Sequence, residues 1–149
     1  RKPARAASPS HHTERTQRAH QNICAGTNQE EIDKPMNPVQ FYKCLSDETR
    51  LRCLMLVEHE GELCVCELTE ALQEIQPKVS RHLAQLRQCK LLLDRRQGQW
   101  IFYRINPSLP NWAKAVLTQT TEANPVFLKD NLANLCRMGD RPERARACC

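Results

Sequence analysis

Residues 76–87 decide the fold, and they read Gln-Pro-Lys-Val-Ser-Arg-His-Leu-Ala-Gln-Leu-Arg. Val79, Leu83 and Leu86 recur at i, i+4 and i+7, which is the spacing of a helix with one apolar face on a core. Proline is well tolerated in a first helical turn, so we expect this helix to begin at Gln76. The opposite face of the helix is polar and basic.

A short helix is expected just before this one, from about Cys66 to Leu72 or Gln73. Two helices joined by a tight turn, with a basic second helix, indicate a helix-turn-helix that binds DNA. Side chains near the start of a helix lodged in the major groove can reach the base edges. The expected groove-facing residues are Gln76, Lys78, Ser80, Arg81, His82 and Gln85.

Two β-forming runs, 91–96 and 100–105, follow and are separated by a polar turn, which predicts a hairpin. A hairpin directly after a recognition helix is called a wing, and its basic side chains contact phosphates. The expected wing contacts are Arg95, Arg96 and Gln99. The predicted fold class is therefore mainly α with a β-hairpin wing (α+β), a winged helix-turn-helix.

The flanking sequence predicts further helices. A short one covers about 39–45, and Ser46-Asp47 then offers an N-cap for a helix that ends at Gly61. The helix from about Asn111 to Thr121 presents more apolar surface than a lone helix can bury, so we expect self-association through it. A weaker helix is expected over 126–136.

Three segments follow from this pattern. Residues 1–35 show no apolar period and are expected to be disordered or a non-native leader. Residues 36–122 are expected to form a winged-helix DNA-binding and dimerisation domain. Residues 123–149 are expected to form a C-terminal helix and a flexible tail containing cysteines.

Charge and composition narrow the class of protein. Segment 76–106 carries seven basic side chains and one acidic one, while 36–75 carries three basic and eight acidic. Such a local basic excess points to a polyanionic partner. Aromatic residues make up 5% of the chain, which argues against a large catalytic core. Neither a membrane-spanning run nor a signal-peptide core is visible, so we expect a cytoplasmic protein without a membrane partner.

Cys64 and Cys66 form a candidate metal site. In an extended chain, i and i+2 side chains point to one side, whereas on an ideal helix they lie about 200° apart. Both sulfurs therefore bind one ion only if the start of the helix is non-helical or unwinds, which suggests a switch. Thiolates favour soft ions such as As(III), Sb(III), cadmium or lead.

The other cysteines are expected to be mostly thiols. Cys44 and Cys53 are expected in the core, and Cys89 packed or half exposed. Cys44–Arg50 and Cys89–Arg95 fit a C-x5-R pattern of thiol phosphatases, but the first contains acidic residues and the second an apolar strand. Neither can cradle an oxyanion. No acid/base pair or triad is apparent, so we expect no enzyme and no catalytic cofactor.

Several motifs occur together in a fixed order and resemble the ArsR/SmtB family of bacterial winged-helix repressors, most closely the arsenical-resistance operon repressors. The resemblance spans about 38–120. It implies a homodimer that occupies double-stranded operator DNA until As(III) or Sb(III), acting as inducer, releases it. The motifs are Leu45-Ser46-Asp47-Glu48-Thr49-Arg50-Leu51, Glu62-Leu63-Cys64-Val65-Cys66-Glu67-Leu68, the 76–87 run and Leu92-Leu93-Asp94-Arg95-Arg96-Gln97-Gly98-Gln99-Trp100.

The family pattern implies Cys64 and Cys66 as two ligands, but its third cysteine is replaced here by Thr69. The third ligand is then a small thiol, Cys148, Cys149 or another cysteine. Two alternatives stay open. One is a cadmium-, lead- or zinc-responsive repressor of the same fold, and the other is a repressor regulated by thiol redox chemistry.

Overall fold

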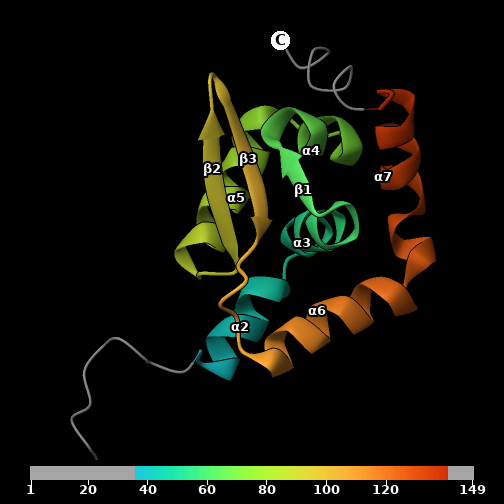
Figure 1. The fold of residues 1–149 in the computed structure, drawn as a ribbon. Coiled ribbons are helices and arrows are strands. Elements are labelled where there is room, and N and C mark those ends of the chain that lie inside the picture. The colour runs from blue at the N-terminus through green and yellow to red at the C-terminus, as the bar shows by residue number, and fades with distance from the viewer. Residues whose placement is uncertain (1–35, 141–149) are drawn as a thin grey trace, which may run out of the picture. The chain divides into compact units, whose positions relative to one another are not determined.

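The computed structural model describes residues 36–140. The segments expected to be a leader and a tail, 1–35 and 141–149, lie outside the described residues. Figure 1 shows the arrangement of the elements. They are α2 (Pro38–Leu45), α3 (Glu48–Glu60), β1 (Glu62–Cys64), α4 (Val65–Leu72), α5 (Gln76–Gln88), β2 (Leu92–Gln97), β3 (Trp100–Ile105), α6 (Asn111–Ala123) and α7 (Pro125–Arg137).

Helix α3 is the centre of the core. Five consecutive residues, from Cys53 to Val57, are buried, and α3 contacts each of the other described helices as well as β1 and β3. Its start is capped as expected, since the Asp47 side chain accepts a hydrogen bond from the Arg50 N–H at 3.0 Å. Its end is Gly61, whose φ of 89° favours glycine.

Helices α4 and α5 form the predicted helix-turn-helix. Helix α4 ends at Gln73, which adopts the left-handed conformation with φ 52°, and α5 begins at Gln76 as expected. Val79, Leu83 and Leu86 are completely buried, which confirms the apolar stripe. The turn of three residues, 73–75, makes the position of α5 depend directly on that of α4.

The wing belongs to a three-stranded antiparallel sheet with the order β1-β3-β2. β2 and β3 form the predicted hairpin, with Gln97 opposite Trp100 and Gly98 in its turn at φ 62°. Strand β1 was not expected from the sequence. A strand of three residues carries no readable alternation, and β1 exists because Cys64 pairs with Phe102 of β3. The winged helix-turn-helix class is confirmed.

Helices α6 and α7 follow the sheet and pack on other elements through distinct contacts. The Trp112 ring of α6 meets the Phe41 ring of α2 edge-on, at 4.9 Å between centroids. Helix α7 is fixed to the end of α4, because the side-chain amides of Asn131 and Asn134 both donate to the Ala71 carbonyl, at 2.9 and 3.0 Å. The predicted domain boundary at 122 stays a prediction.

None of the helices between residues 36 and 140 combines the length and the apolar character that a membrane crossing requires.

Candidate nucleic-acid interface and thiol site

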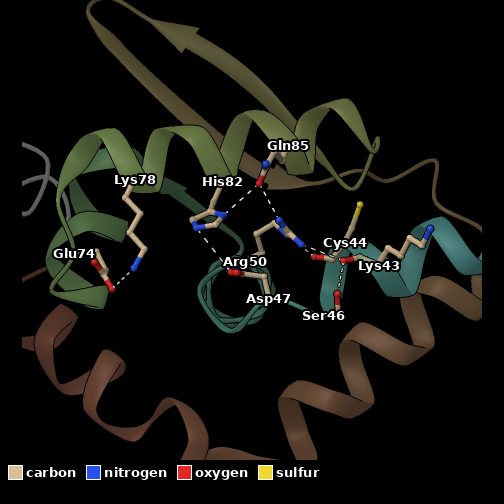
Figure 2. Close-up of polar contacts among 9 residues, drawn as sticks. All are labelled: Lys43, Cys44, Ser46, Asp47, Arg50, Glu74, Lys78, His82 and Gln85. Atoms are coloured by element: carbon tan, nitrogen blue, oxygen red, sulfur yellow. Dashed lines mark hydrogen bonds and ion pairs between the residues drawn. The ribbon is translucent and has the colours of Figure 1, made fainter.

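Three of the six predicted groove residues on α5 are exposed. Gln76, Arg81 and Gln85 lie on its outer side, whereas Lys78 and Ser80 are half-buried. The Lys78 ammonium forms an ion pair with Glu74 at 2.8 Å, which anchors the start of α5 to the turn before it (Figure 2). We use the name reading face for Gln76, Lys78, Ser80, Arg81 and Gln85.

His82 occupies a different position from the one expected. Its side chain is 9% exposed and points inward, with Nδ1 3.3 Å from Gln85 Oε1 and Nε2 3.8 Å from Asp47 Oδ1 (Figure 2). The physical reason is its place in the sequence, since it lies three residues after Val79 and next to Leu83, at the edge of the buried stripe. This corrects its expected place on the polar face of α5, and its contact with DNA stays a prediction.

Arg50 links α2, α3 and α5, a role that the sequence analysis missed. Its guanidinium donates to the carbonyls of Cys44 and Lys43 at 2.9 and 3.1 Å, and to Gln85 Oε1 at 2.9 Å (Figure 2). The two carbonyls lie in the last turn of α2, where backbone acceptors lack helical partners. Arg50 therefore provides hydrogen-bond donors for the carbonyls at the end of α2, and it also orients Gln85 of the reading face.

The wing holds the remaining predicted DNA contacts. Arg96 and Gln99 are exposed near the hairpin turn. Arg95 is exposed too, but its guanidinium makes two hydrogen bonds to the Glu62 carboxylate of β1, at 2.6 and 2.9 Å. Hydrogen bonding to Glu62 raises the pKa of Arg95, so the guanidinium stays charged. The same hydrogen bonds fix the orientation of its side chain.

The thiol site, by which we mean Cys64 and Cys66, lies where β1 becomes α4. Cys64 is 2% exposed and is the N-cap of α4, with extended backbone at φ −89° and ψ 168°. Cys66 is half-buried in the first turn of α4. The two cysteines thus lie on backbone of two different conformations, and their binding of one ion stays a prediction.

Glu67 is part of the structure that keeps the start of α4 wound. Its side chain is completely buried, and Oε2 accepts a hydrogen bond from the Cys64 N–H at 2.8 Å in a capping box. The Glu67 carboxylate therefore fixes the backbone at Cys64, the first residue of the thiol site.

The third ligand position of the family pattern holds no thiol. The Thr69 hydroxyl donates to the Val65 carbonyl at 2.7 Å, so it closes a turn of α4. Among residues 36–140, histidine, cysteine and acidic side chains nowhere gather in a group of three or more that could hold a metal. Cys148 and Cys149, the predicted third ligands, lie outside the described residues.

The other described cysteines differ in reactivity. Burial raises the pKa of the Cys53 thiol to about 12, so it stays protonated and is a poor ligand at neutral pH. Cys44 is buried and Cys89 half-buried, as expected, but the two are joined in a disulfide. This corrects the expectation that both are thiols. They are 45 residues apart in the sequence, and the fold brings the end of α2 close to the end of α5.

A helix-turn-helix with an exposed basic face, followed by a hairpin, defines a DNA-binding regulator of the winged-helix class. A family model described as bacterial regulatory protein, arsR family, matches residues 47–92. The arsenic resistance transcriptional regulator ArsR2 of Pseudomonas putida is 54% identical over 114 residues, covering 76% of this chain and 99% of the relative. The arsenical resistance operon repressor of Escherichia coli is 42% identical over 111 residues, covering 74% and 95%.

Among solved structures, the transcriptional regulator HlyU from Vibrio vulnificus superimposes with a TM-score of 0.52 at 27% identity, covering 73% of this chain and 97% of that one. The chain belongs to the ArsR family of bacterial regulatory proteins. By this similarity it is an arsenic-resistance transcriptional repressor, a regulator and not an enzyme.

Proposed function

We propose that this repressor binds operator DNA as a homodimer through the reading face and the wing, and that As(III) or Sb(III) releases it by binding Cys64 and Cys66. The observation that carries the proposal is the place of the two thiols across the boundary between β1 and α4, one helix ahead of α5. Pyramidal metalloid ions prefer soft thiolate ligands, and this pair supplies two.

The DNA contacts divide by chemistry. Arg81 lies exposed on α5 and is suited to the acceptors of a guanine edge, whereas Arg96 on the wing is suited to phosphates. Gln85 is oriented by Arg50, so its amide is presented in a fixed position. Arg95 is bound to Glu62 and contributes chiefly by holding the hairpin on β1.

Coupling between inducer and DNA runs through α4. An ion bound by both thiolates needs Cys66 on the same side of the chain as Cys64, which opens the first turn of α4 and competes with the Glu67 cap. The three-residue turn then transmits the change to α5. A coupling of about 1–3 kcal/mol lowers DNA affinity roughly 5- to 150-fold.

The third ligand is assigned outside the described part of the chain. Thr69 closes a helical turn and offers no thiolate, so we propose that Cys148, Cys149 or a small thiol completes the coordination. The dimer is proposed to form through α6, where Trp112 is 39% exposed, together with Val39 and Tyr42 of the adjacent α2, at 63% and 53%. As a regulator of transcription, the protein is proposed to act in the cytoplasm.

The experiment is a titration of the protein–operator complex with arsenite, antimonite, cadmium, lead, zinc and peroxide in parallel. We expect arsenite and antimonite to release wild-type protein, while Cys64→Ser and Cys66→Ser bind operator normally and are not released. Cys136→Ser removes an exposed thiol of α7 and is the matched control that keeps the response. Release of the Cys64→Ser/Cys66→Ser double variant by arsenite would falsify the site, and release by cadmium, lead or zinc alone would favour a divalent-metal sensor.

A further inference from the structure

A second pair of cysteines meets in this fold, and the proposed function uses neither. Cys44 lies near the end of α2, and Cys89 is the C-cap of α5. The structure joins them by a disulfide, with their Cα atoms 7.1 Å apart. Figure 2 shows the Cys44 sulfur pointing from α2 toward the C-terminal end of α5. The bond therefore links the end of the recognition helix to the end of α2.

Solvent-borne reagents can reach this bond. A surface pocket of about 340 Å³ has both cysteines in its wall. Two cations, Lys43 and Arg50, line the same pocket, and cations near a cysteine favour its nucleophilic thiolate form. By contrast, Cys53 is completely buried in α3 and its pKa of about 12 keeps it protonated. Oxidants are thus directed to the pair and not to the core thiol.

We propose that Cys44 and Cys89 are a reversible oxidation site for small hydroperoxides, which gives the repressor a redox response separate from the thiol site. One thiolate attacks the peroxide oxygen, the O–O bond breaks, and a sulfenic acid and water (or an alcohol) form. The second thiol then displaces the sulfenic oxygen, with loss of a second water and formation of the S–S bond. Two thiols are oxidised and one peroxide is reduced, and a dithiol reductant reverses the change.

The link acts on DNA binding through the two elements that it joins. Helix α2 packs on α6, the proposed dimer helix, through the ring contact between Phe41 and Trp112. Helix α5 carries the reading face, and Gln85, four residues before Cys89, is held toward α2 by Arg50. A dimer must place two recognition helices about one turn of DNA apart. A covalent bond between α5 and α2 restricts how far each recognition helix can move to match the spacing of the DNA grooves. The oxidised form therefore binds operator more weakly.

This inference rests on the proposed function for its DNA-binding effect, but the chemistry of the pair can be measured without DNA. The full chain is reduced with dithiothreitol, exchanged into buffer, treated with hydrogen peroxide and digested without reduction. Mass spectrometry then identifies the linked peptides, and fluorescence anisotropy measures operator affinity of the same samples. Cys89→Ser and Cys89→Ala remove one partner by different substitutions, and Cys136→Ser again serves as the control.

Peroxide is expected to produce a Cys44–Cys89 peptide and to weaken operator binding of wild type and Cys136→Ser by about fivefold or more, reversibly. Both Cys89 variants should bind operator, keep their arsenite response and lose the peroxide effect. Absence of the linked peptide, or a peroxide effect of equal size in the Cys89 variants, overturns the inference. Failure of the reduced protein to bind any operator counts against the proposed function. Detection or absence of the Cys44–Cys89 peptide tests the oxidation site independently of that result.

Discussion

Asp47 shows how one residue serves both a helix and the interface beside it. Its carboxylate caps α3 through the Arg50 N–H and faces the buried His82 ring of α5. The hydrogen bond from the Arg50 backbone is the main cause that holds the pKa of Asp47 below its usual value of 3.8, and His82 adds to this. The N-cap of α3 and the position of the recognition helix α5 on α3 therefore depend on the same side chain.

Removing this cap is expected to destabilise the fold. Asp47→Ala should lower the free energy of unfolding by about 1 kcal/mol, because a backbone donor at the start of α3 loses its acceptor. Asp47→Asn retains a capping oxygen and is the matched control, with a smaller loss. Chemical denaturation at neutral pH measures both. Equal stability of the alanine variant and wild type would show that the cap contributes nothing.

A comparison of wild type with Asp47→Asn tests the contribution of the Asp47 charge to stability. Because its folded pKa lies below the unfolded one, its charged form stabilises the fold above about pH 4, and this contribution is lost as the pH falls through the folded pKa. The advantage of wild type over Asp47→Asn should therefore be present at pH 6 and decline as the pH falls below about 4. An advantage that grows on acidification would contradict this assignment.

At the scale of elements, helices α3 and α5 were predictable because local rules and tertiary packing agree. The N-cap at Asp47, the stop at Gly61 and the stripe of Val79, Leu83 and Leu86 are each visible in the sequence. β1 was not, because its three residues form a strand only through pairing with β3. The burial of His82 was not predictable in the same way. His82 lies at the edge of the apolar stripe of α5, and periodicity alone does not tell which edge packs toward Asp47.

The candidate sites divide in the same way. The position of Cys64 and Cys66 at the start of α4 was predictable because the two cysteines are neighbours in the sequence, while their binding of an ion stays a prediction. The Cys44–Cys89 bond and the Arg50 links were not, since both depend on the contact between α2 and α5. No spacing rule connects residues that far apart.

The helix α5 and the wing are expected to contribute differently to DNA binding. Arg81→Ala should cost about 1–3 kcal/mol on the operator and reduce discrimination between sequences, since it removes a base contact. Arg96→Ala should weaken binding to all duplexes alike and reduce the slope of log affinity against log salt by about 1, since it removes a phosphate contact. Salt titrations on operator and scrambled duplexes measure both.

Arg95→Ala is the comparison for the wing, because its charge is already paired with Glu62. It should change the salt slope less than Arg96→Ala does. A salt slope unchanged by Arg96→Ala, or specificity unchanged by Arg81→Ala, would contradict the division of roles.

At the scale of the whole molecule, two helical regions serve two purposes. Helix α7 is fastened to the rest of the domain, with Arg52 of α3 donating to Asn131 at 2.7 Å and stacking on the Phe127 ring at 3.9 Å. Helix α7 exposes Val126, but the exposed Trp112 of α6 lies beside α2, whose Val39 and Tyr42 are exposed too, so the apolar surface there is shared by two helices. This contrast favours α6 as the dimer helix.

Ala115→Glu tests this dimer surface, because Ala115 is exposed on α6 and lies outside the core of the domain. A charge there should shift the protein toward monomer in sedimentation velocity and weaken operator binding, with the thermal unfolding of the domain preserved. Val126→Glu places the same charge on α7, where Val126 is 82% exposed, and should leave the dimer intact. A dimer unaffected by Ala115→Glu and disrupted by Val126→Glu would move the interface to α7.

The most direct measurement is amide hydrogen exchange over residues 65–69, recorded for the full chain with and without arsenite. If the inducer opens the first turn of α4, exchange at these amides should accelerate in wild type and stay unchanged in Cys66→Ser. Unchanged exchange in wild type under conditions where arsenite still releases the operator would contradict the account.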